Sequence, residues 1–180
     1  MSRTVFRVAV GGAVGLMLGL FGGVAWAANI SCSGGNCYGT SNADTITGTS
    51  GQDFIYAYGG NDDVSAWAGP DRVGAGGGAD DVRGNDGNDQ YTTSGGLIYG
   101  LSGGDGNDLV DGQDGKDVVY GGDGNDTLRG GPGDDIIVAD EDGCTTDYIY
   151  AGQGDDYCYI TQYADYVDNC DHLVVRYTCV

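Results

Sequence analysis

Aspartate recurs at every ninth residue over most of this chain, and its carboxylate is the group best placed to do chemistry. Between Gly103 and Val138 four units follow one another without a gap: GGDGNDLVD, GQDGKDVVY, GGDGNDTLR and GGPGDDIIV. Each unit has Asp at its sixth position. If every second unit returns to the same side of a solenoid, these carboxylates stack at the spacing of parallel strands, about 4.8 Å. Two carboxylates at that distance repel by roughly 3 kcal/mol at an effective dielectric of 20, which a cation between them would remove.

Calcium suits such a stack of carboxylates. It takes six to eight oxygens at about 2.3–2.6 Å, so oxygens on opposite sides of the ion lie about 5 Å apart. Backbone carbonyls of the turns can supply the oxygens that the carboxylates do not. The predicted metal ligands are the sixth-position aspartates Asp53, Asp62, Asp71, Asp80, Asp89, Asp108, Asp117, Asp126, Asp135, Asp147 and Asp156.

Strands and tight turns must position these aspartates. The last three residues of each unit alternate outward, inward and outward, with one apolar side chain entering the core. The glycine-rich end permits positive φ angles and therefore a tight turn. A short strand plus a turn every nine residues predicts an all-β solenoid with two units in each coil and parallel strands.

The four consecutive units closely resemble the nonapeptide of the repeats-in-toxin family, the RTX or hemolysin-type calcium-binding proteins. The resemblance implies a parallel β-roll, a right-handed solenoid, here of about thirteen repeats that bind about eight calcium ions. Family members that are toxins, proteases or lipases carry their chemistry in a separate domain. The expected mature chain of 153 residues leaves no room for one, so we expect no enzymatic activity.

The nine-residue register extends from Gly39 to Asp168, the predicted β-roll. Its eighth positions are apolar or aromatic and include Tyr91, which the phase places in the core. The segment from Thr93 to Ser102 has no sixth-position acid and is interpreted as one repeat unit of a coil with a one-residue bulge. On that phase one row of sites is Asp53, Asp71, Asp89, Asp108, Asp126 and Asp147, and the other is Asp62, Asp80, Asp117, Asp135 and Asp156. If the segment loops out instead, the two rows exchange partners.

The two ends of the chain differ from the repeats. Residues 1–27 have the basic start, apolar stretch and Ala-x-Ala ending of a signal peptide, which predicts secretion and no membrane span after cleavage. Residues 28–38 form an expected N-terminal cap closed by a disulfide between Cys32 and Cys37, and residues 169–180 an expected C-terminal cap strand. The remaining cysteines, Cys144, Cys158, Cys170 and Cys179, allow three pairings, among which the sequence does not choose.

Composition limits the kinds of partner that the chain is expected to bind. The mature chain has five basic and 27 acidic residues, a formal charge of −22, so nucleic acid is an improbable partner. The lone His172 has no companion for a catalytic or metal site. Seven of the thirteen tyrosines follow Asp147, several of them facing outward, which leaves open an alternative function: a secreted adhesive or structural solenoid that binds glycan or a protein. We expect a monomer.

Overall fold

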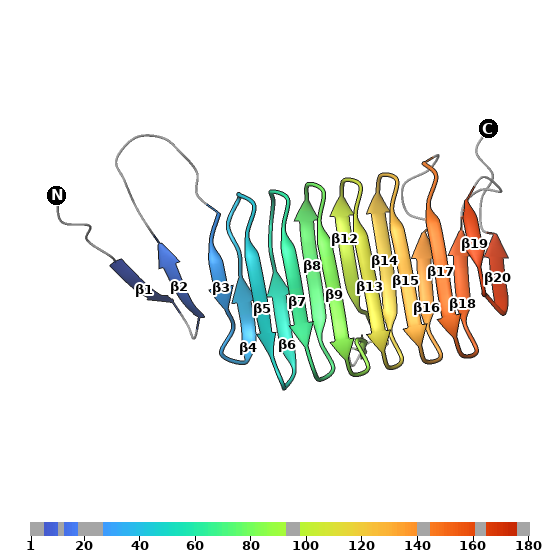
Figure 1. The fold of residues 1–180 in the computed structure, drawn as a ribbon, viewed down its shortest axis with the longest axis horizontal. Coiled ribbons are helices and arrows are strands. Elements are labelled where there is room, and N and C mark those ends of the chain that lie inside the picture. Colours follow the sequence, from blue (N-terminus) through green and yellow to red (C-terminus); the bar gives the residue numbers. More distant parts are fainter. Residues whose placement is uncertain are drawn as a thin grey trace.

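A computed structural model of the chain describes residues 6–10, 13–17, 27–92, 98–139, 145–160 and 165–175. Within these ranges all of the regular structure is β-strand, and no helix is long or apolar enough to cross a membrane. The strands lie side by side like the rungs of a ladder, from β3 at one end of the stack to β20 at the other (Figure 1). The prediction of an all-β parallel solenoid is confirmed.

Two sheets form the walls of the solenoid, and from β3 onward consecutive strands alternate between them, apart from β10 and β11. The ten-stranded first sheet contains, in order, β1 (Phe6–Val10), β2 (Ala13–Met17), β3 (Asn29–Ser31), β5 (Thr45–Thr49), β7 (Asp63–Trp67), β9 (Asp81–Asp86), β13 (Leu109–Asp114), β15 (Thr127–Pro132), β17 (Tyr148–Gln153) and β19 (Tyr166–Asp168). The eight-stranded second sheet contains β4 (Gly35–Tyr38), β6 (Asp53–Tyr56), β8 (Arg72–Gly77), β12 (Leu101–Asp105), β14 (Val118–Asp123), β16 (Ile136–Ala139), β18 (Tyr157–Ile160) and β20 (His172–Val175). From β3 onward all neighbours in both sheets are parallel, whereas β1, β2 and β3 pair antiparallel.

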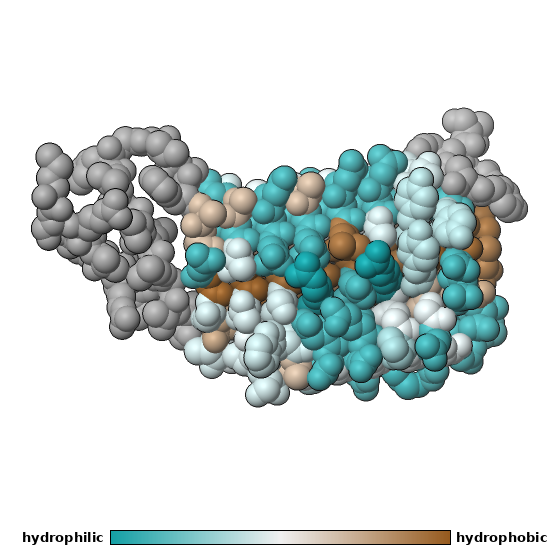
Figure 2. All heavy atoms as spheres, in the orientation of Figure 1, coloured by the Kyte–Doolittle hydropathy of each residue, from teal (hydrophilic) through white to brown (hydrophobic). Residues whose placement is uncertain are grey.

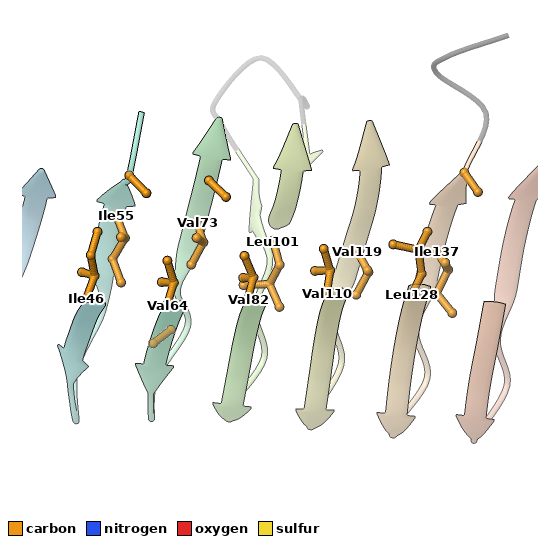
Figure 3. Close-up of a cluster of buried hydrophobic side chains, with 14 of the residues drawn as sticks. Ile46, Ile55, Val64, Val73, Val82, Leu101, Val110, Val119, Leu128 and Ile137 are labelled. Atoms are coloured by element: carbon orange, nitrogen blue, oxygen red, sulfur yellow. The ribbon is translucent and has the colours of Figure 1, made fainter. Parts of the chain in front are cut away.

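The register confirms two nine-residue units in each coil. Ile46 pairs with Val64 and Val64 with Val82, each step being 18 residues. Eighth-position side chains from the two sheets therefore meet in a single file along the axis (Figure 3). This core is thin, and consists mainly of one apolar residue from each strand: Ile46, Ile55, Val64, Val73, Val82, Leu101, Val110, Val119, Leu128, Ile137 and Ile149, all at most 1 % exposed.

The prediction that Thr93–Ser102 forms one repeat unit of a coil is wrong. The chain leaves the stack after Asp89 and re-enters it at Gly100, so that β12 pairs with β8, Leu101 lying opposite Val73. Leu101 thus fills the core position that the repeat phase assigns to Tyr91. β10 (Tyr91–Thr92) instead pairs antiparallel with β11 (Ile98–Tyr99), outside both parallel sheets. Ten residues are inserted between two regular units, and a simple count of nines cannot detect where they begin.

Two disulfides close short segments at the two ends. Cys32 and Cys37 are bonded, as predicted, and connect β3 to β4. Cys158 bonds Cys170, which selects one of the open possibilities for those two residues, while Cys144 and Cys179 lie outside the described residues. Both expected caps contain strands of the stack: β3 and β4 pair in parallel with β5 and β6, and β20 pairs with β18.

The surface matches the acidic composition. On the face that Figure 2 shows, hydrophilic residues cover most of the area, and apolar residues are visible chiefly in a narrow band along the long axis. With so little apolar area to bury, hydrophobic packing alone is a weak source of stability for a chain of this length.

Candidate metal-binding turns

Glycines allow the turns to stack in contact with one another. The fourth-position Gly106 has φ +150°, and a Cβ built there would lie 1.3 Å from the carbonyl oxygen of Gly78 in the preceding coil. Gly104, at the second position, has φ +113° and its Cβ would lie 1.9 Å from the oxygen of Gly76. No other residue fits such a contact, which explains the glycines and brings a row of carbonyl oxygens against the next turn.

The sixth-position aspartates connect the coils through hydrogen bonds. From Asp62 and Asp71 onward, the side-chain Oδ1 accepts a hydrogen bond from the backbone N–H of the aspartate one coil earlier: Asp80 N donates to Asp108 Oδ1 at 2.7 Å, and Asp89 N to Asp117 Oδ1 at 2.7 Å. Two files result. One runs Asp44, Asp62, Asp80, Asp108, Asp126, Asp147 and Asp165, and the other Asp53, Asp71, Asp89, Asp117, Asp135 and Asp156.

The predicted rows are therefore wrong beyond the inserted segment, and the exchanged rows are correct. Asp108 follows Asp80 and not Asp89, because ten extra residues shift every later unit to the opposite side of the solenoid. All eleven predicted aspartates still lie in the turns of one file or the other. The error concerns which of them are neighbours, and not which of them face the stack.

These carboxylates are buried, although nothing in the repeat pattern alone required it. All twelve sixth-position aspartates from Asp44 to Asp156 expose 3 % or less of their surface. The oxygen that does not serve the file points back across its own turn, where a Cβ on Gly103 would lie 2.4 Å from Asp108 Oδ2. Within the described residues, this second oxygen is buried without a hydrogen-bond partner in Asp62, Asp71, Asp80, Asp89, Asp108, Asp117, Asp135 and Asp156.

Burial has a large electrostatic cost for these groups. It raises the pKa of Asp89 to about 8, and the negative charges of Asp117 and Asp71 add to the effect, while the hydrogen bond from the Asp71 backbone opposes it. Burial likewise raises the carboxyl pKa to about 7 in Asp71 and Asp117, to about 6 in Asp62, Asp108 and Asp135, and above its usual value in Asp80 and Asp156. Without a counter-ion, the ionised turns oppose the fold.

The donor set fits a hard divalent cation. Buried carboxylate oxygens without hydrogen bonds, stacked at strand spacing beside backbone carbonyls, are the ligands that calcium prefers. Within the described residues no three His, Cys, Asp or Glu side chains are arranged to hold a metal by themselves. Any ion between two coils must therefore take part of its shell from turn carbonyls, such as that of Gly78 below Gly106.

The first turns are bonded differently. Asp53 Oδ2 accepts hydrogen bonds from the backbone N–H and the hydroxyl of Thr49, at 2.7 and 2.8 Å. In Asp44, which was not among the predicted ligands, Oδ2 accepts from the Thr40 backbone N–H and Oδ1 from the Thr40 hydroxyl. A threonine at the second position thus bonds the Oδ2 that later turns leave without a partner among the described residues, while Asp53 Oδ1 is buried without one.

A second row of hydrogen bonds between the coils was not predicted from the sequence. Asn at the fifth position accepts, through Oδ1, a hydrogen bond from the fifth-position N–H of the next coil: Asn107 from Asn125 at 2.9 Å, and Asn88 from Lys116 at 2.9 Å. Asn61 and Asn125 do the same for Ala79 and Thr146. The recurring Gly-Asn-Asp triplet was the available signal, since an amide at this position can bond the neighbouring turn without adding charge.

The fold is a parallel β-solenoid, and its stacked turns present buried carboxylates and carbonyls. These features define a class of cation-binding protein. The profile of the RTX calcium-binding nonapeptide repeat matches this chain in four copies, at residues 38–73, 68–91, 102–137 and 146–159, which together cover more than half of it. The chain belongs to the RTX calcium-binding nonapeptide repeat family, whose repeats bind calcium and form a β-roll. Comparison with curated proteins found no match, and comparison with solved structures found none.

Proposed function

We propose that the chain is a calcium-responsive roll that folds when calcium binds between adjacent turns of each aspartate file. The observation that carries the proposal is the stack of buried carboxylates with raised pKa and an unbonded oxygen. Each interval between file neighbours offers two such carboxylates and the carbonyls of two turns. We propose no catalytic role and a monomeric state.

The two files set the expected number of ions. The first file has four intervals between Asp62 and Asp147, and the second has four between Asp71 and Asp156. The interval below Asp71 involves Asp53, whose Oδ2 is already bonded by Thr49. About eight complete sites follow, which is the number expected from the sequence.

Eight weak sites would suffice to fold the chain. An extracellular site with a dissociation constant near 10⁻⁴ M contributes roughly 1.4 kcal/mol at about 1 mM calcium. Eight of them contribute roughly 11 kcal/mol, which is comparable with the stability of a whole domain. Calcium would also neutralise the buried carboxylates and so remove the cost of ionising them in the folded chain.

We further propose that the chain is secreted after cleavage behind Ala27. Two observed disulfides, Cys32–Cys37 and Cys158–Cys170, support an oxidising compartment, because disulfides rarely persist in the reducing cytosol. Extracellular calcium near 1 mM would keep such weak sites filled, whereas cytosolic calcium would not.

Native mass spectrometry of the chain at graded calcium tests the proposal. We expect about eight ions, bound over a narrow range of concentration because each filled interval orders the next. A chain that binds one or two ions, or eight ions without any change in charge-state distribution between extended and compact forms, contradicts the proposed calcium-dependent folding.

A further inference from the structure

A groove on the outer face of the second sheet lies apart from the ion-binding turns. It encloses about 550 Å³, within the range of small-molecule sites. Its walls are Tyr56 and Tyr58 on one side and Tyr120 on the other, with Arg72 and Ser102 between them. None of the sequence patterns that predict calcium binding requires this groove.

The register of four strands explains the shape. Tyr56, Gly74, Ser102 and Tyr120 occupy the same ninth position on β6, β8, β12 and β14 and lie in register with one another. Two small residues therefore separate two tyrosines, and three strand spacings place the walls about 14 Å apart. Gly74 has open space where a Cβ would be, so the floor is bare.

The tyrosine wall is held in a fixed stack. Tyr38 lies nearly parallel to Tyr56, with ring centroids 5.7 Å apart, and nearly parallel to Tyr58, with centroids 6.4 Å apart. The Arg72 guanidinium carbon lies 5.7 Å from the centroid of Tyr56. Rings stacked in this way present a rigid apolar edge and hydroxyl groups to the groove at little entropic cost.

Tyr58 places a large aromatic side chain at a turn position that the repeat holds at positive φ. Its φ is +80°, at the second position of the repeat, where Trp67, Asn85 and Gln113 also have positive φ, and the residue is 59 % exposed. An exposed aromatic residue in the left-handed region neither fills the core nor eases the turn. The ring of Tyr58 instead lines the groove.

Charge distinguishes the groove from the rest of the surface. The chain has 27 acidic residues and only seven basic ones, yet the described residues that line the groove include one arginine and no acid. This lining suits an anionic group better than the surrounding acidic surface does.

We propose that this groove binds a saccharide whose pyranose ring carries a carboxylate. The apolar face of the ring packs on the tyrosine wall, the carboxylate accepts hydrogen bonds from Arg72, and Ser102 and the tyrosine hydroxyls bond to the sugar hydroxyls. The bare floor of Gly74 lets the ring approach the backbone. Because β8 and β12 continue into the ion-binding turns at Gly76 and Gly104, the groove forms only when those turns are ordered.

Two matched substitutions separate binding from folding. Tyr58→Gly removes part of the tyrosine wall and introduces a residue that suits the positive φ of the second position, so the roll should fold at the same calcium concentration or lower. Trp67→Gly is the control, since Trp67 has φ +82° at the same repeat position and does not line the groove. Arg72→Gln removes the charge and keeps a hydrogen-bonding side chain.

The assay is NMR titration of the calcium-loaded full chain with methyl glucuronide and with methyl glucoside, which differ only in the carboxylate. Circular dichroism of each sample establishes first that it is folded. We expect the glucuronide to bind at least about fivefold more tightly than the glucoside, as one charge-assisted pair would give. Arg72→Gln should abolish the preference for the glucuronide. Tyr58→Gly should weaken the binding of both sugars by at least about fivefold, and Trp67→Gly should change the affinity for neither sugar.

Three results would overturn the proposal. One is a folded, calcium-loaded chain that binds no glucuronide up to about 20 mM, well above the millimolar range of weak sites. Another is equal affinity for the two sugars, and the third is an equal effect of Tyr58→Gly and Trp67→Gly. A chain that fails to fold with calcium refutes the proposed function instead, and circular dichroism tells the two failures apart.

Discussion

Replacing Asp108 by Asn should affect stability in opposite directions with and without calcium. Its Oδ1 accepts the hydrogen bond from Asp80 N, which an Asn oxygen can retain, while its Oδ2 is buried without a partner. In calcium the substitution weakens the intervals on both sides, toward Asp80 and Asp126. At roughly 1.4 kcal/mol for each site, the loss is up to about 3 kcal/mol.

Without calcium the same substitution should stabilise the folded form. Burial raises the pKa of Asp108 from 3.8 to about 6, so its charge at pH 7.5 opposes folding. Two pKa units correspond to about 3 kcal/mol, which solvent near the turn reduces to about 1–2 kcal/mol. Asn carries no charge and avoids this cost.

Urea unfolding followed by circular dichroism measures the first effect in 1 mM calcium, where the estimate applies. The effect without calcium is measured in chelator with added sucrose, which favours the compact form. The folded fraction of the Asp108→Asn chain is then compared with that of the unsubstituted chain. Asp123→Asn is the control, because Asp123 is an exposed acid at the third position of the next turn in the same file. Equal effects of the two substitutions, or loss of stability in chelator as well as in calcium, would refute ordered ligation and leave only bulk acidity.

Three further predictions test other parts of the account. Gly106→Ala should destabilise the calcium-loaded roll by about 4 kcal/mol or more in urea unfolding, since its Cβ would lie 1.3 Å from the Gly78 oxygen. Gly77→Ala is the control and should cost under about 1 kcal/mol in the same assay, because Gly77 has open space around its Cβ position and no positive φ. In chelator, strand content measured by circular dichroism should rise as the pH falls. The raised pKa of Asp89, about 8 against 3.8, gives stability that is present below pH 3.8 and lost as the pH rises through 8, worth about 6 kcal/mol. A spectrum that does not change with pH would contradict this prediction. Mass spectrometry of secreted protein should find a chain that begins at Ala28 with no free thiol, and an intact Met1 would contradict the secretion proposal.

Periodicity was enough to predict the strands, the inward residues and the aspartates of the turns. A side chain at the eighth position, such as Val110, must face inward once its strand alternates, and glycine at the fourth position must stack on glycine. These features are local to one unit, and each unit repeats the same constraint. The agreement between residue choice and geometry is therefore visible in the sequence.

Features that depend on contacts between coils could not be read in the same way. The inserted residues between Asp89 and Gly100 have no repeat signal, so nothing in the sequence showed that Leu101 takes the core place expected of Tyr91. Nor did the sequence show that Thr49 bonds Asp53 Oδ2, because that hydrogen bond depends on the turn's closed shape. The tyrosine wall is built from two strands and a strained turn, and only the structure brings Tyr38 and Tyr58 together.

We propose that calcium, and not the thin apolar core, folds this chain. The most direct test is far-ultraviolet circular dichroism of the disulfide-intact chain, from excess chelator to several millimolar calcium at neutral pH. We expect a largely unfolded spectrum in chelator and a cooperative transition to a strand-rich spectrum near the calcium concentration that half-fills the sites. Magnesium, which demands a smaller and more regular oxygen shell, should not replace calcium. A strand-rich spectrum that persists unchanged in excess chelator would contradict the account.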